Sequence, residues 1–167
     1  MSKATLAIAG VSLVSALALG FTATADAQLL THKDLSLAVA TTIAQGAIDA
    51  CKAQGYNVSA HVVGREGQVI VGLRNEKAGL ATYENSMKKA FTARTLRMPS
   101  GQSVNNIKGN PTAGQLFLTN IVPAQGALPI MVGTETIGAI GISGAPGGDK
   151  DEACAKVGID KVAAQLK

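Results

Sequence analysis

Two pairs of strand-like segments constrain the fold more than any other feature of this sequence. Residues 56–63 and 68–74 alternate between two faces and are separated by a short turn that contains two glycines. Residues 127–132 and 136–143 form the second pair, with Gly133-Thr134 at the turn. Connections this short join antiparallel neighbours. The sequence therefore predicts an antiparallel sheet made from two hairpins.

Three helices are predicted around these hairpins. A capping-box pattern at Thr31 and Asp34 predicts a first helix over residues 28–54. Helical spacing of apolar residues predicts two more, over residues 80–98 and 149–167. The expected fold class is α+β, an antiparallel sheet from two hairpins flanked by helices. Apolar or small residues recur at every fourth position of the first helix, at Leu35, Val39, Ile43, Ala47 and Cys51.

Glycine and proline mark two further features. Residues 99–123 are punctuated by both, which predicts a long irregular loop of the kind that often has a function. Gly138 and Gly141 lie inside a predicted strand. Glycine at such positions indicates that another element packs close to the strand backbone.

The N-terminus has the pattern of an export signal. Lys3 is followed by an uncharged, largely apolar run to Ala25, and Ala25-Asp26-Ala27 provides a peptidase site before Gln28. A retained membrane anchor is the alternative, because the run is long enough to span a bilayer. We expect residues 1–27 to be cleaved, and residues 28–167 to form one periplasmic or secreted domain with no stable membrane anchor.

Positive charge is concentrated in the middle of the chain. Residues 64–110 contain eight Lys or Arg and three Glu, a net charge of +5. We therefore expect an anionic partner to meet this region. Nucleic acid is a poor candidate, because the chain has no Trp and only two Tyr and three Phe with which to stack on bases. A solvated helix face is the alternative interpretation of the basic residues.

Cys51 and Cys154 both fall on predicted helices, one near each end of the domain. An even number of cysteines in an exported protein favours a disulfide. The alternative is two small buried residues at a helix contact. The sequence leaves both interpretations open.

Patterns typical of an enzyme are missing from the sequence. The glycines at 144–148 precede a helix that opens with carboxylates, which would repel a phosphate. No nucleophile elbow and no cluster with metal-ligand spacing is present. His32, at the predicted start of the first helix, and His61, on the more polar face of the first strand, are the only imidazoles available to an iron centre. Simple exposure of His32 and a structural hydrogen bond of His61 are the alternatives.

The second hairpin and the segment after it resemble the GlcG/HbpS-like haem-binding family. The resemblance is carried by residues 126–132, 137–144 and 151–155, and residues 58–63 and 89–93 fit the same pattern. It implies a profilin-like α+β fold and homo-oligomers, often octamers. Some exported members are haem-linked accessories of sensor systems, others occur with glycolate utilisation, and a related domain accompanies corrinoid adenosyltransferases. This sequence departs from the family at Gly64, where Asp is usual, and at Ser100, where Thr usually follows the proline.

We therefore expect an exported haem-binding homo-oligomer, with a role in haem sensing, storage or scavenging, rather than an enzyme. In this hypothesis His32 or His61 ligates the iron. One alternative is an accessory protein or enzyme that acts on a small organic acid of the glycolate type or on a corrinoid, with residues 99–123 as a lid. Another is a structural oligomer without a ligand. The basic residues expected to meet the haem propionates are Lys88, Lys89, Arg94 and Arg97.

Overall fold

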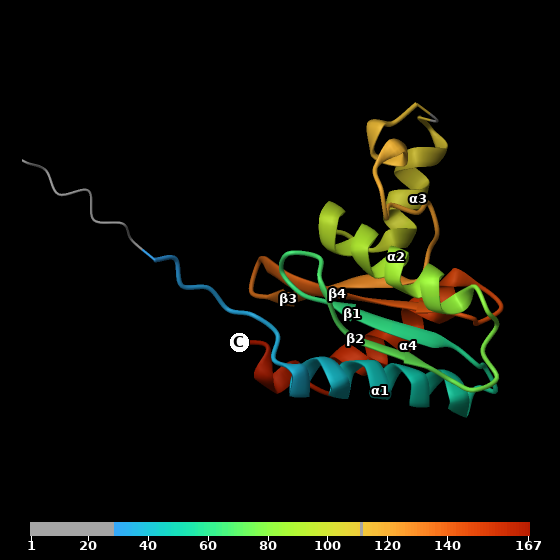
Figure 1. The fold of residues 1–167 in the computed structure, drawn as a ribbon, viewed down its shortest axis with the longest axis horizontal. Helices are drawn as coiled ribbons and strands as arrows, with labels where there is room; N and C mark the ends of the chain where they lie inside the picture. The colour runs from blue at the N-terminus through green and yellow to red at the C-terminus, as the bar shows by residue number, and fades with distance from the viewer. Residues whose placement is uncertain (1–28, 111) are drawn as a thin grey trace, which may run out of the picture. The chain divides into compact units, whose positions relative to one another are not determined.

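The computed structural model describes residues 29–110 and 112–167. The predicted signal sequence lies outside these residues. The domain begins at His32, and its centre is a four-stranded sheet in the order β2-β1-β4-β3 (Figure 1). Every neighbouring pair in this sheet is antiparallel. The predicted fold class is therefore confirmed.

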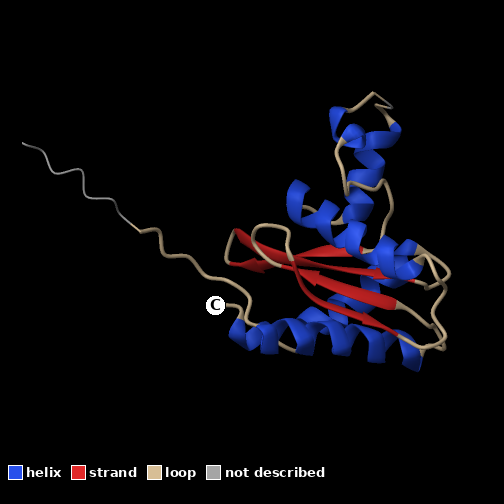
Figure 2. Ribbon diagram, viewed as in Figure 1, coloured by secondary structure: helices blue, strands red, loops and turns tan. Residues whose placement is uncertain are grey.

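Both hairpins form where the sequence predicts them. The first consists of β1 (Ser59–Val63) and β2 (Val69–Arg74), and the second of β3 (Ala127–Val132) and β4 (Glu135–Ser143). The two central strands are β1 and β4, which pair with each other. Each hairpin therefore contributes its more buried strand to the centre of the sheet. Helices cover both faces of the sheet, so all five residues of β1 are buried. Figure 2 shows the helices on either side of the strands.

Helices α1 (Leu37–Ala53) and α4 (Gly148–Asp160) pack together on one face of the sheet. Cys51 and Cys154 form a disulfide between them, which settles the choice that the sequence left open. The main core lies here. It includes the fully buried residues Ile43, Ala47, Val58, Val62, Ile130, Ile140 and Ile142.

The first helix begins nine residues later than predicted, at Leu37. Ser36 is its N-cap, because its hydroxyl accepts a hydrogen bond from the Val39 backbone N–H at 3.3 Å. The predicted capping box is wrong, since the Asp34 carboxylate accepts from the N–H of Leu35 instead. Leu35 still joins the core from the segment before the helix.

Helix α2 (Thr82–Leu96) covers the other face, mainly over β1 and β4. It buries small and polar residues: Ser86, Lys89, Ala90, Thr92 and Ala93. A Cβ atom on Gly141 would collide with the α2 backbone at Ser86 and Ala90. The expected close approach to this strand is therefore confirmed. Two side chains of β1 form hydrogen bonds to α2 across this contact: Ser59 to Thr82 and His61 to Ser86.

Two expectations about irregular segments need correction. The predicted loop over residues 99–123 contains α3 (Ser100–Lys108) and a short 3-10 helix, η1 (Gly114–Phe117). Because α3 buries Ser100, Gly101, Ser103 and Ile107, mostly small or polar residues, the sequence lacks an apolar helical stripe there. The last helix ends at Asp160 and is followed by η2 (Ala163–Gln165), so it does not reach residue 167. Figure 1 shows α3 pointing away from the sheet.

Candidate functional site

His61 lies in the middle of β1 on the face that α2 covers, and 2% of its surface is exposed. Its Nδ1 atom is 2.8 Å from Ser86 Oγ. The Ser86 hydroxyl donates its only proton to the Tyr83 carbonyl at 2.9 Å, so it accepts from the imidazole. Nδ1 therefore carries the ring proton, and Nε2 keeps a free lone pair.

Burial determines the charge of this histidine. Loss of hydration lowers the pKa of His61 from 6.5 to about 4, because the imidazolium form needs water more than the neutral form does. The imidazole is therefore neutral at neutral pH. A neutral ring whose other nitrogen is held by a hydrogen bond is the form in which histidine binds a metal. His61 Nε2 is thus a candidate iron ligand.

The absence of a side chain at Gly72 lets the His61 and Tyr83 rings lie close over the edge strand. Gly72 lies opposite His61 in the pairing of β1 with β2. A Cβ atom on Gly72 would lie 2.6 Å from His61 Nε2 and 2.6 Å from Tyr83 Oη. The His61 and Tyr83 rings meet edge to face with 4.3 Å between centroids. Both polar atoms therefore lie over the Cα atom of Gly72, in space that a larger residue at position 72 would need.

A line of side chains on α2 extends from the position of His61 toward the end of the helix. Tyr83, Met87, Phe91 and Arg94 recur at helical spacing, so they lie along one side of α2. Tyr83 reaches Gly72 of β2, and Phe91 reaches Gly67 of the following turn. We call these four residues the α2 strip. It is about 16 Å long, begins beside His61, and changes from aromatic and thioether groups to a guanidinium.

Comparisons with known proteins show the family of this chain. A family model described as haem-degrading protein, HbpS-like, matches residues 35–160. The chain belongs to the HbpS-like family.

Solved structures with the HbpS-like fold include a double mutant of HbpS from Streptomyces reticuli. It is 29% identical, matches 93% of this chain and 98% of its own, and has a TM-score of 0.77. The PduOC:heme complex is 22% identical over 75% of this chain and 93% of its own, with a TM-score of 0.69. That likeness concerns the fold alone. An uncharacterised 15.0 kDa protein of Citrobacter freundii, in the dhaT-dhaS intergenic region, is 33% identical over 66% of this chain and 80% of its own.

The two histidines proposed as iron ligands lie in different surroundings. His32 is exposed in the segment before α1, and not in the first turn of that helix as predicted. Its charge acts on Glu135 at the turn of the second hairpin. His61 instead lies under α2. Among the residues that the structure describes, no group of three His, Cys, Asp or Glu could hold a metal ion.

The basic residues proposed to bind the haem propionates also lie in different surroundings. The prediction for Lys89 needs correction. Its ammonium lies 2.8 Å from the buried Asp151 carboxylate and also donates to the Ile142 carbonyl, so it is paired inside the protein and does not face a ligand. Lys88 pairs with Glu84 one turn earlier on α2. Arg94 belongs to the α2 strip, and Arg97 is exposed at the end of the helix.

Three residues of the site were not proposed from the sequence: Gly72, Tyr83 and Ser86. Gly72 pairs with His61 because the register of the first hairpin shifts between Val62 and Val63, and the length of the turn does not indicate this shift. The roles of Ser86 and Tyr83 depend on how α2 lies across the sheet, which no local pattern indicates.

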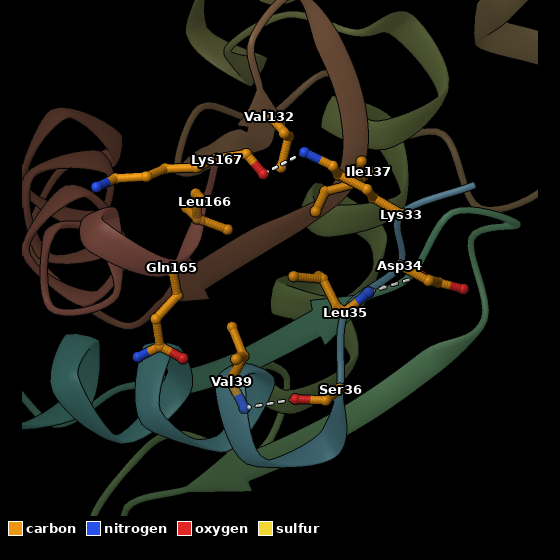
Figure 3. Close-up of a pocket in the computed structure, with 10 residues that line it drawn as sticks. All are labelled: Lys33, Asp34, Leu35, Ser36, Val39, Val132, Ile137, Gln165, Leu166 and Lys167. Atoms are coloured by element: carbon orange, nitrogen blue, oxygen red, sulfur yellow. Dashed lines mark hydrogen bonds between the residues drawn. The ribbon is translucent and has the colours of Figure 1, made fainter. Parts of the chain in front are cut away.

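A second cavity of about 230 Å³ lies where α1 begins and the last residues fold back (Figure 3). Leu35, Val39, Ile137 and Leu166 contribute apolar walls. The ammonium of Lys33 donates to the carbonyl oxygen of Lys167 at its side. None of its lining residues is a common haem ligand such as His, Cys, Met or Tyr. The α2 strip is therefore the better site for an iron macrocycle.

In the described part of the chain, every helix is too short or too polar to cross a membrane.

Proposed function

We propose that this protein binds haem, with His61 Nε2 as the iron ligand and the α2 strip along the macrocycle. The observation that carries the proposal is the neutral, oriented imidazole of His61, whose Nε2 lies over Gly72. Family membership supports a haem-related function. One structural neighbour, PduOC, was solved as a haem complex.

The residues at this site are chemically suited to hold a haem. Nε2 has a free lone pair, Gly72 has no side chain that could cover it, and Tyr83, Met87 and Phe91 offer aromatic and thioether surface. Tyr83 Oη occupies part of the approach to Nε2. Because Tyr83 is 44% exposed, its ring can turn outward without opening the core. Bound haem would supply the iron for redox chemistry or gas binding, while His61, Ser86 and Gly72 orient and admit it.

Hemin titration tests this proposal. We expect a saturable Soret shift in the wild-type protein, a weaker one in His61→Gly, and partial recovery of that variant with added imidazole. His32→Ala is the matched control and should titrate like the wild type. A wild-type protein without a saturable shift contradicts haem binding, and an unchanged His61→Gly protein contradicts the assignment of the ligand.

We also propose that the chain is exported and works in the periplasm or outside the cell. The Cys51–Cys154 disulfide supports this proposal, because such bonds persist mainly in oxidising compartments. Fractionation of cells that express the full chain, with mass spectrometry of the N-terminus, tests it. A mature chain that starts at Gln28 is expected, and an uncleaved cytoplasmic chain would contradict the proposal.

Assembly into homo-oligomers is the third part of the proposal. Leu80, Phe117 and Leu118 expose 91%, 78% and 54% of their surfaces. Phe117 and Leu118 are neighbours in the chain, and large exposed apolar side chains of this kind can mark an interface. Light scattering on the purified protein should give a mass of several chains, and a strictly monomeric mass at all concentrations would contradict assembly.

A further inference from the structure

Arg94 lines a small pocket at the far end of the α2 strip. The pocket lies between the C-terminal part of α2 and the turn from β1 to β2, and its volume is about 140 Å³. The Phe91 ring contacts Gly67 beside it. The other lining residues are Arg65, Glu66 and Thr95.

The two arginines of this pocket differ in what holds them. Arg65 is fixed, because its guanidinium is 2.5 Å from the Glu135 carboxylate and donates to the Lys33 carbonyl. Arg94 has neither a hydrogen bond nor an ion pair with any residue that the structure describes, although its Nε atom is buried. The Nε atom of Arg65 is likewise buried without a partner. Leaving a buried donor unpaired costs about 1–3 kcal/mol.

Neighbouring positive charges disfavour the charged guanidinium of Arg94 further. Burial lowers the pKa of Arg94, and the positive charges of Arg97 and Arg65 lower it more. Glu66 and Asp34 act in the opposite direction, but each has a smaller effect than Arg97 or Arg65. An anion in the pocket would pair the free donors and relieve the repulsion together.

We infer that Arg94 binds a carboxylate group in this pocket, with Arg65 as a fixed second charge and Phe91 as an apolar wall. The planar guanidinium matches a carboxylate with two parallel hydrogen bonds. One source is a propionate of a tetrapyrrole that is held at His61, and this part rests on the proposed function. Arg94 follows Ser86 by eight residues, about 12 Å along the helix, so one extended ligand can span the α2 strip. The other source is a free small carboxylate.

Porphyrin esters test the first source. Hemin and hemin dimethyl ester share the iron, but only hemin has free carboxylates. We expect the wild type to bind hemin roughly tenfold or more tightly than the ester, and Arg94→Gln to bind hemin and the ester with similar affinity. Arg97→Gln removes the same charge from the exposed end of α2 and should keep the preference. Equal binding of hemin and ester by the wild type contradicts the propionate source.

Two measurements without iron separate this inference from the proposed function. Protoporphyrin IX fluorescence reports carboxylate-dependent binding that does not need His61. Thermal melting of the apo protein with succinate, against dimethyl succinate at equal ionic strength, tests the free carboxylate. In either assay, the inference is supported if the wild type responds to the ligand, Arg94→Gln does not respond, and Glu66→Gln responds more strongly. This result supports the inference even if hemin fails to bind. No Arg94-dependent response to hemin, protoporphyrin IX or succinate overturns it.

Discussion

Lys89 and Asp151 form an ion pair between helices on opposite faces of the sheet, with 2.8 Å between Nζ and Oδ2. Both side chains are at least 95% buried. The pair passes the end of β4, where Lys89 also donates to the Ile142 carbonyl and Asp151 accepts from the Ala145 N–H. Burial raises the pKa of Asp151, although Lys89 and the Ala145 N–H act to lower it. The pair therefore joins α2 to α4 at a considerable cost in desolvation.

Removing one partner of this pair should destabilise the protein strongly. We expect Lys89→Met to lower the free energy of unfolding by about 3–5 kcal/mol, because it leaves the Asp151 carboxylate buried without its partner. Urea denaturation of Lys89→Met, Asp151→Leu and the double variant measures the effect. The double variant should recover much of the loss, since apolar pairs often replace buried ion pairs at little cost. Additive losses in the double variant would contradict this expectation.

The disulfide should contribute several kcal/mol. Cys51 and Cys154 are separated by 103 residues and are fully buried. Closing a loop of this length restricts the unfolded chain, and removing a native disulfide from a small domain costs about 2–5 kcal/mol. Melting with and without dithiothreitol should show a large drop in the wild type. A Cys51→Ala/Cys154→Ala variant should melt at a lower temperature than the wild type, and dithiothreitol should not change its melting temperature. A wild type whose melting temperature is also unchanged by dithiothreitol would refute the prediction.

Acid should destabilise the protein through His61. Its pKa is 6.5 in the unfolded chain and about 4 in the folded one. The unfolded state therefore binds more protons between these values, so the stabilising contribution is complete above about pH 6.5 and lost by about pH 4. Urea denaturation across this range should show a steeper fall for the wild type than for His61→Gln. Parallel curves would mean that His61 titrates alike in both states.

Adding one methyl group at position 72 should block the iron site. The new Cβ atom of Gly72→Ala would lie 2.6 Å from His61 Nε2, which is too close for a ligand to enter beside it. We expect hemin affinity to fall at least tenfold, about 1.4 kcal/mol, while far-UV circular dichroism stays unchanged. Gly109→Ala is the control, because a Cβ atom there meets no atom within 4 Å. Undiminished hemin binding by Gly72→Ala would place the iron elsewhere.

The candidate site could be predicted only in part from the sequence. His61 and Arg94 were identified by residue type, since few side chains can ligate iron or pair with carboxylates. The same reasoning included Lys89, because sequence does not indicate that Asp151, 62 residues later, takes up its charge. Ser86 and Tyr83 were not identified as site residues, because the apolar residues that predict α2 do not mark its inward face, which buries small and polar residues such as Ser86 and Thr92.

By itself, the sequence resembled the family, and it determined the two hairpins and the helices α1, α2 and α4. The hairpins and helices depend on local periodicity and short turns, in which interacting residues are near neighbours in the chain. Only the tertiary structure decided the disulfide, the buried ion pair, the free Nε2 of His61 over Gly72 and the unpaired guanidinium of Arg94. Each depends on how elements distant in sequence pack together, because burial and partners, more than residue type, set the charge and availability of a side chain.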